Sequence, residues 1–245
     1  MGSVQGKLSP DSRLKEWREF ERYLIYQNRF VLNRKWSNFV NEIVGACSSQ
    51  VVNLNKDQSF YRARAHPLEK SGTRPEECLS WDELIPSSDK ARAGRVNPEG
   101  IPVLYLSSDE RTAIAESRVW QGAWVTVGEA KLIQNQSVVN LTIGESNFNE
   151  QLKKNSVSTN DQFVCLLDIV FKKPAFPEEP VVSYAASQYL AEVFKKEGYD
   201  GIAYRSSLNE EGYNLALFDP NRVQPGKRFL HKVISIKYET RSFKT

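Results

Sequence analysis

Residues 94–117 read GRVNPEGIPVLYLSSDERTAIAES, and this stretch predicts a turn, a buried strand and a short helix in succession. Two glycines and an Asn-Pro pair favour the turn, because glycine accepts positive φ angles and proline fixes its own φ. The apolar run 103–106 is bounded by turn residues, which is typical of a short strand. Ser107 precedes Glu110 by three residues, as in a capping box, so we expect a helix to begin there.

Glu116 stands out on this predicted helix because small and apolar residues surround it in the sequence. A carboxylate in such surroundings is either solvated or held for a purpose, since burying a charge is costly unless the charge is paired. Glu116 is therefore a candidate functional residue.

The composition is that of an ordinary globular protein. The chain has 245 residues, of which 40% are hydrophobic and 26% charged. A net charge of +3 does not favour a dedicated nucleic-acid-binding protein, although local basic patches remain compatible with it. No apolar run approaches the roughly 20 residues that span a bilayer, and the first residues lack the apolar core of a signal peptide. We therefore expect a cytoplasmic protein with no membrane association.

The cysteines and histidines do not form a metal-binding motif. Cys47, Cys78 and Cys165 are widely spaced, and His66 and His231 are the only histidines. A closed zinc site needs four ligands at motif spacing, which this sequence does not offer. These features predict reduced cysteines and no metal.

The first 50 residues differ in pattern from the rest of the chain. Apolar residues recur at spacings of three and four over residues 11–46, which predicts one or two amphipathic helices. We expect residues 1–50 to form a helical segment that packs on the main domain or on a partner. Residues 51–245 are expected to form one domain.

Strands dominate the predicted main domain, with two short helices among them. The mixture indicates an α+β fold with mixed or antiparallel sheets. Residues 65–93 predict a long polar loop, and Gly198 ends the second predicted helix, 187–196. Strands are predicted at 59–64, 103–106, 138–141, 163–171, 201–204, 215–218 and 233–238, with the nearly all-apolar segment 163–171 in the centre of a sheet.

Three polar residues at predicted strand edges, Arg62, Glu116 and Ser206, occur in an order that resembles the RES family, which is named for an Arg, a Glu and a Ser. The resemblance covers roughly residues 57–225. Its matching stretches are 60–62 (FYR), 94–107 (the turn and strand above), 112–116 (TAIAE), 201–206 (GIAYRS) and 214–220 (NLALFDP).

The resemblance implies a fold related to ADP-ribosyltransferases and an enzyme that attacks the nicotinamide–ribose bond of NAD+. Members of this family are toxins of toxin–antitoxin pairs, found in bacteria, that hydrolyse or phosphorolyse NAD+ or transfer ADP-ribose to a protein. NAD+ is then a consumed substrate, inorganic phosphate a possible co-substrate, and no cofactor is expected. The implied partner is a neutralising antitoxin with a helix-turn-helix domain. The protein would contact nucleic acid only indirectly, through this antitoxin. Whether the protein forms a homo-oligomer stays open.

The residue types suit this chemistry. Cleavage develops positive charge on the ribose, which Glu116 can stabilise. Arg62 can grip the pyrophosphate through paired hydrogen bonds, with Arg64 as a rival on the same strand face. Ser206, or its neighbour Ser207, can position a phosphate or a ribose hydroxyl. Expected NAD+ contacts also include Arg95, Asn97, Tyr105, which can stack on the nicotinamide, Ser207 and Asn214.

Two alternatives stay open. One is ADP-ribosyl transfer to a protein target. The other is a non-catalytic or RNA-directed protein, for which the basic pairs Arg34-Lys35, Arg62 with Arg64, and Lys172-Lys173 provide candidate contacts. Neither GxGxxG nor GxxxxGK[ST] occurs in the sequence, so a Rossmann or P-loop site has no support.

Overall fold

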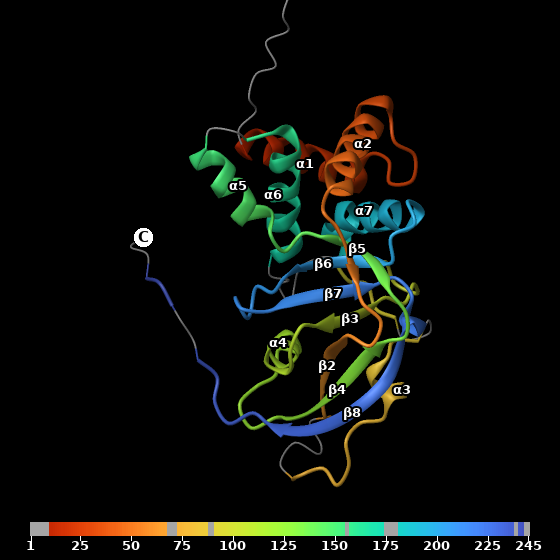
Figure 1. Ribbon diagram of the computed structural model, residues 1–245, viewed down its shortest axis with the longest axis vertical. Helices are drawn as coiled ribbons and strands as arrows, with labels where there is room; N and C mark the ends of the chain where they lie inside the picture. Colours follow the sequence, from red (N-terminus) through yellow and green to blue (C-terminus); the bar gives the residue numbers. More distant parts are fainter. Residues whose placement is uncertain are drawn as a thin grey trace, which may run out of the picture.

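One mixed sheet forms the centre of the protein. In the computed structural model, which describes residues 10–67, 73–87, 91–154, 157–173, 181–237 and 240–242, eight strands pair in the order β1-β5-β6-β7-β3-β2-β4-β8 (Figure 1). The β5–β6 pair is parallel and the other pairs are antiparallel, which confirms the predicted α+β class. The strands are β1 (Val51–Leu54), β2 (Ser59–Ala65), β3 (Leu104–Ser107), β4 (Trp124–Leu132), β5 (Gln136–Asn140), β6 (Gly201–Arg205), β7 (Tyr213–Leu217) and β8 (Val223–Lys232).

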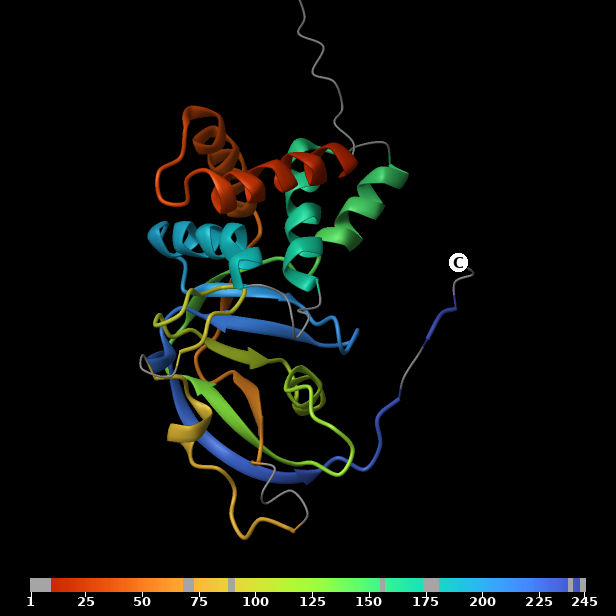
Figure 2. The ribbon, with the colours of Figure 1, turned by 180° about the vertical axis from the view of Figure 1, so that it is seen from behind.

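Helices gather at one end of the sheet. Figures 1 and 2 show α1 (Pro10–Tyr26), α2 (Arg34–Ser48), α5 (Gly144–Lys153), α6 (Thr159–Lys172) and α7 (Ala185–Lys196) at the β5–β6 end of the molecule. The short helices α3 (Trp81–Leu84) and α4 (Glu110–Glu116) lie beside β2 and β3 instead. No helix in the described ranges is both long and apolar enough to cross a membrane.

The N-terminal helices confirm the prediction for residues 11–46 and pack on the rest of the chain. The ring of Phe20 on α1 contacts Phe39 on α2 and Tyr189 on α7. Phe39 in turn contacts Phe163 on α6. These residues belong to one buried cluster that continues to Ile202 on β6. The two parts of the chain, before and after residue 50, share this core. Their division into a helical segment and a domain stays a prediction.

The expected central strand 163–171 is wrong, because these residues form most of α6. Ser158 and Asp161 make a capping box at the start of this helix, which is the local signal for a helix that begins at Thr159. The helix packs against α1, α2, α5 and β6, so that apolar residues are needed on most of its faces. A helix buried on most faces carries no visible 3.6-residue period, and its sequence then resembles that of a buried strand.

Three smaller expectations also need correction. The last strand is β8 and ends at Lys232, so 233–237 are not a strand, and Tyr238 lies outside the described residues. Helix α4 is capped by the Asp109 side chain, which accepts from the Thr112 amide, whereas Ser107 ends β3. More than two helices follow residue 50, and α3 lies within the expected loop 65–93. The strands β1 and β4 were not predicted individually.

The sheet brings distant residues together at its centre. Strand β3 pairs with β7 and β2, so that Ser107 is opposite both Asn214 and Tyr61. Helix α4 follows β3 at once, and the 206–212 loop joins β6 to β7 beside it. Gly212 allows this contact, because a Cβ there would lie 1.9 Å from the Thr112 Oγ1 atom. The end of α4, the end of β6 and the start of β7 therefore converge.

Candidate active site

Glu116, the last residue of α4, is held by side chains from two other elements. Its Oε1 atom accepts a hydrogen bond of 2.6 Å from Ser206 Oγ and one of 2.7 Å from Asn214 Nδ2. Among the described residues nothing bonds to Oε2, which leaves this oxygen for a ligand. The predicted association of Glu116 with Ser206 and Asn214 is thus present in the structure, although the roles of these residues are not tested by it.

Ser206 and Asn214 are themselves fixed in place. Ser206 is 1% exposed, and its Oγ accepts the backbone N–H groups of Leu208 and Asn209, both over 3.1 Å. The Asn214 Oδ1 atom accepts from Ser107 Oγ over 3.0 Å. The Ser206 hydroxyl thus makes three hydrogen bonds within the protein, one of which positions Glu116. Its neighbour Ser207 lines the cavity at Glu116.

Tyr105 on β3 is the anchor of the 94–101 turn. Its hydroxyl donates to Asn97 Oδ1 over 2.8 Å and accepts the Val96 N–H over 3.0 Å. Burial raises the pKa of the phenol above its ordinary value, so it stays a hydrogen-bond donor. Gly94 is needed here, because a Cβ at this position would lie 2.6 Å from the Tyr105 hydroxyl oxygen.

Asn97, an expected NAD+ contact, holds the turn instead of reaching out. It is 2% exposed, and its Nδ2 atom donates to three carbonyl groups, those of Arg92, Pro98 and Ile101. Helix α7 supports the same turn from the other side, where Gln188 donates to the Gly94 and Asn97 carbonyls. Sequence analysis missed Gln188, because nothing in the sequence of an amphipathic helix indicates a distant turn as its partner.

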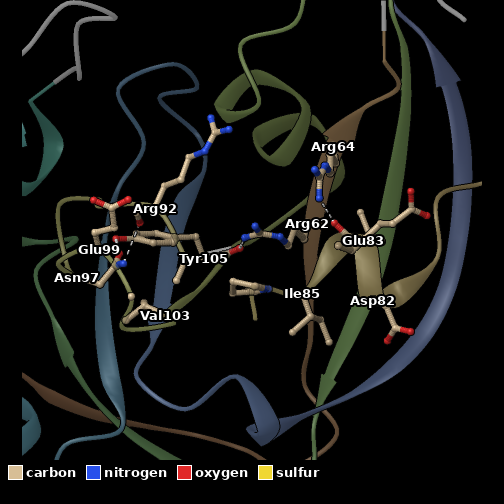
Figure 3. Close-up of a pocket in the computed structure, with 14 residues that line it drawn as sticks. Arg62, Arg64, Asp82, Glu83, Ile85, Arg92, Asn97, Glu99, Val103 and Tyr105 are labelled. Atoms are coloured by element: carbon tan, nitrogen blue, oxygen red, sulfur yellow. Dashed lines mark hydrogen bonds between the residues drawn. The ribbon is translucent and has the colours of Figure 1, made fainter. Parts of the chain in front are cut away.

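Arg62 and Arg64 lie on the same face of β2, as their spacing predicts, but their partners differ. Figure 3 shows the Arg62 guanidinium directed at the backbone of Tyr105, whose carbonyl it meets at 2.8 Å. Arg64 is exposed and donates to the Glu83 carbonyl. Burial, followed by the like charge of Arg64, lowers the pKa of Arg62 to about 10, which leaves this side chain cationic at neutral pH.

Three adjoining cavities meet at Tyr105. The first, here called the Glu116 cavity, has a volume of about 280 Å³ and includes Arg95, Arg118 and Ser207 in its lining. A second of about 310 Å³ contains Arg62 and Tyr61, and Glu116 and Asn214 line it as well. The third, the outer cavity, has a volume of about 730 Å³ and lies between β2, α3 and the 94–101 turn (Figure 3). Tyr105 lines all three, so the cavities adjoin one another at this residue.

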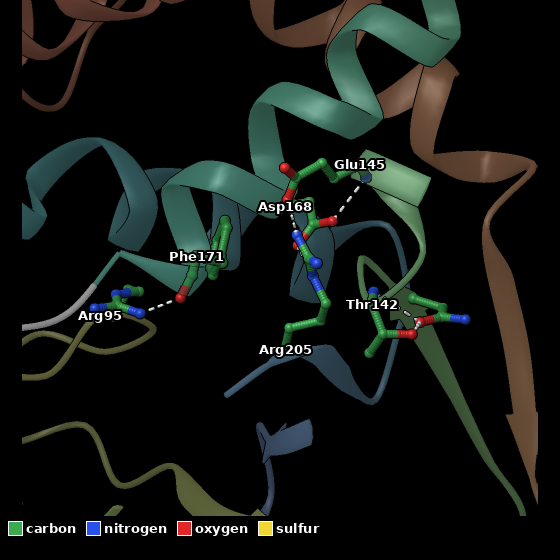
Figure 4. A network of polar contacts seen from close by, with 7 residues as sticks. Arg95, Thr142, Glu145, Asp168, Phe171 and Arg205 are labelled. Atoms are coloured by element: carbon green, nitrogen blue, oxygen red, sulfur yellow. Dashed lines mark hydrogen bonds and ion pairs between the residues drawn. The ribbon is translucent and has the colours of Figure 1, made fainter. Parts of the chain in front are cut away.

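A second polar network supports the cleft from the helical side. Arg205, the last residue of β6, bridges Asp168 on α6, at 2.9 Å, and Glu145 on α5 (Figure 4). Asp168 is fully buried and also accepts the Glu145 N–H at 2.8 Å. Arg95 donates to the carbonyls of Phe171 and Lys173 at the end of α6. Sequence analysis missed Asp168 as a partner of Arg205, because the segment was predicted to be a strand.

Arg118 has an unusual backbone conformation. It follows Ser117, the C-cap of α4, and has a φ of 50°, in the left-handed region that L residues rarely adopt. Its side chain lines the Glu116 cavity. Within the described ranges, no group of three or more His, Cys, Asp or Glu side chains is arranged to hold a metal ion.

The family of the chain follows from comparison with known sequences. The sequence pattern of the RES domain matches residues 74–229, which is more than half of the chain. The chain belongs to the RES family. The matched part of this RES protein includes Glu116, Ser206 and Asn214, whereas Arg62 and Arg64 precede it.

Two further comparisons concern curated sequences and solved structures. No curated protein sequence matches this RES protein. Its structure is similar to the crystal structure of the M. tuberculosis MbcT–MbcA toxin–antitoxin complex, over 78% of this chain and 92% of that chain, with a TM-score of 0.41 and 13% sequence identity.

Proposed function

We propose that this RES protein cleaves the nicotinamide–ribose bond of NAD+ at Glu116. One observation carries the proposal: Ser206 and Asn214 both bond to Oε1 of Glu116, so that the carboxylate is fixed in a residue that lines the cleft. A carboxylate fixed in this way can stabilise positive charge that develops beside it, without reorganising during the reaction. Membership of the RES family supports the choice of NAD+ as the substrate.

The reaction is a substitution at C1′ of the nicotinamide ribose. The C1′–N bond breaks and its electron pair leaves with nicotinamide, whose ring nitrogen thereby loses its positive charge. Glu116 stabilises the oxocarbenium-like ribose in the transition state, as carboxylates do in glycoside hydrolysis. An oxygen of water or of phosphate then bonds to C1′. Water gives up a proton in this step, which the Glu116 carboxylate can accept, whereas phosphate attacks through an oxygen that carries no proton.

The neighbouring residues orient the substrate in this scheme. Tyr105 lines both the Glu116 cavity and the outer cavity, and its ring can offer a flat surface to the nicotinamide. Ser206 is not a nucleophile in this scheme, since it is buried and its hydroxyl donates to Glu116. Ser207, which lines the cavity, is placed to contact a ribose hydroxyl.

The biological role proposed with this chemistry is that of a toxin in a toxin–antitoxin pair, acting in the cytoplasm. Uncontrolled NAD+ cleavage would harm the cell that makes the enzyme, so a neutralising protein is required. We propose a helix-turn-helix antitoxin as this partner. The support is RES family membership, which the sequence resemblance associates with such pairs.

ADP-ribosyl transfer to a protein is the second candidate. The outer cavity favours it, because this space of about 730 Å³ adjoins the Glu116 cleft past Tyr105 and is open to an acceptor side chain. The RNA-directed alternative finds no such support. Two of its basic pairs lie on α2 and at the end of α6, in the helical part of the molecule, whereas the third lies on β2, away from these helices (Figure 1).

Incubation of the purified protein with NAD+, with and without phosphate, tests the proposal. Release of nicotinamide is expected from the wild type and not from Glu116→Gln, which keeps the shape of the side chain and removes its charge. Glu192→Gln, a change at an exposed carboxylate on α7, is the matched control and is expected to retain full activity. Intact NAD+ with and without phosphate, and with a cell extract as a source of acceptor protein, would refute the proposal.

A further inference from the structure

The Glu116 cavity and the outer cavity differ in their balance of charge. The outer cavity has three arginines, at 62, 64 and 92, which are matched by three carboxylates, Asp82, Glu83 and Glu99. The Glu116 cavity has four cationic side chains, Arg95, Arg118, Lys172 and Arg205, and Glu116 is the one carboxylate in its lining. An anionic ligand therefore gains more from the Glu116 cavity.

Two of these four cations are already engaged inside the protein. Arg205 is neutralised by Asp168 and Glu145, and Arg95 donates to two carbonyls at the end of α6. Arg118 and Lys172 make no hydrogen bond through their side chains, and no ion pair, with any residue that the structure describes. Arg118 is exposed and Lys172 is half-buried, so both charged groups are accessible to a ligand in the cavity, and Lys172 also interacts electrostatically with Glu145.

The backbone of Arg118 gives independent evidence. The position directly after the C-cap of a helix often has a positive φ, and glycine is the residue that adopts it without strain. Arginine stands here with a φ of 50°. Backbone strain of this kind clusters at active sites and ligand-binding sites.

We infer that Arg118 and Lys172 form a phosphate-binding subsite beside Glu116. The ligand class is a phosphate oxyanion, for which the planar guanidinium provides paired donors and the ammonium a point charge. The source of the phosphate is the pyrophosphate of NAD+, an identification that rests on the proposed function, or a free phosphate acceptor. Arg62, the residue that the sequence favoured for this task, donates through Nη1 to the Tyr105 carbonyl and lines the second cavity, so its role stays a prediction.

Arg118→Gly separates a binding role from a structural one. Glycine relieves the positive φ, so the thermal unfolding midpoint is expected to stay the same or to rise. The affinity for inorganic pyrophosphate, measured by titration calorimetry at low salt, is expected to fall at least about tenfold, the loss of one charge-assisted contact. Lys172→Ala should weaken binding in the same direction, and Arg118→Lys less than Arg118→Gly. Arg111→Ala, an exposed cation on α4, is the control and should bind like the wild type.

The two sources of phosphate give different results with two further ligands. Binding of ADP-ribose that depends on Arg118, with no binding of orthophosphate, assigns the subsite to the dinucleotide. Arg118-dependent binding of orthophosphate assigns it to the acceptor. Wild type that does not bind pyrophosphate, or Arg118→Gly that binds it equally well, overturns the inference. Arg118-dependent pyrophosphate binding by a protein that leaves NAD+ intact supports the subsite and counts against the proposed function alone.

Discussion

The Ser206 hydroxyl donates to Glu116 Oε1 over 2.6 Å, although the two residues are 90 positions apart in the chain. The bond joins the loop after β6 to the end of α4, and it fixes the one carboxylate in the lining of the Glu116 cavity. Asn214 completes the arrangement from β7. The geometry of the site therefore depends on the pairing of strands and not on any local motif.

Ser206→Ala is expected to reduce both stability and activity. The change removes the bond to Glu116 and leaves the Leu208 and Asn209 N–H groups without their acceptor, which costs about 1–3 kcal/mol. Denaturant unfolding measures the loss, and nicotinamide release measures the effect on catalysis. Ser207→Ala, one residue away and without these bonds, should keep the stability of the wild type; equal unfolding curves for both variants would contradict the role given to Ser206.

Gly94→Ala should destabilise the protein through its contact with Tyr105. The new methyl group would lie 2.6 Å from the hydroxyl oxygen, so the ring or the turn must shift, at a cost of about 1–3 kcal/mol. Tyr105→Phe removes this oxygen and also loses its bonds to Asn97 and Val96. The double variant should lose less stability than the sum of the losses in the two single variants, and a double-mutant cycle measures this difference. Strictly additive losses would show that the turn does not rest on this hydroxyl.

Breaking the Asp168–Arg205 pair from one side is expected to cost about 3–5 kcal/mol, because it leaves a buried charge without its partner. Arg205→Met is the sharper of the single changes, since Asp168 is fully buried. The double variant Arg205→Met with Asp168→Leu should recover most of the loss, because no buried charge remains. If both variants unfold at the same denaturant concentration, the pair does not hold α6 to β6.

The Glu145–Arg205 contact predicts a dependence of stability on pH. The hydrogen bond from Arg205 holds the pKa of Glu145 below its ordinary value of 4.5, and this effect outweighs partial burial. Glu145 therefore stabilises the fold above pH 4.5, and this contribution is lost as the pH falls through the lower pKa of the folded state. Glu145→Gln should be less stable than the wild type at neutral pH, and the difference should shrink in acid. A constant difference across this range would exclude the contact as its cause.

The turn, β3 and α4 could be predicted from residues 94–117, because glycine, proline and a short apolar run each restrict the backbone locally. The two N-terminal helices were predictable for a similar reason, since one face of each is exposed and the period of three to four residues is visible. The meeting of Glu116 with Ser206 and Asn214 was suggested by resemblance. No local rule contains it, because strand register places these residues together.

The error at α6 has the opposite cause. Residues 163–168 are buried without interruption, so the sequence shows a solid apolar run with no helical period. Tertiary packing decided the structure there, and the Ser158–Asp161 capping box was the local sign of it. The sequence indicated no role for Arg205. Its partner Asp168 became visible only once the segment was a helix.

The wide separation of the three site residues also governs when the site can exist during synthesis. The ribosome releases Glu116 long before Ser206 and Asn214, and until β6 and β7 have emerged the carboxylate lacks both of its holders. Because a domain generally folds as a unit, the site is assembled only when translation is almost complete. A chain cut short before residue 206 therefore lacks both side chains that fix Glu116.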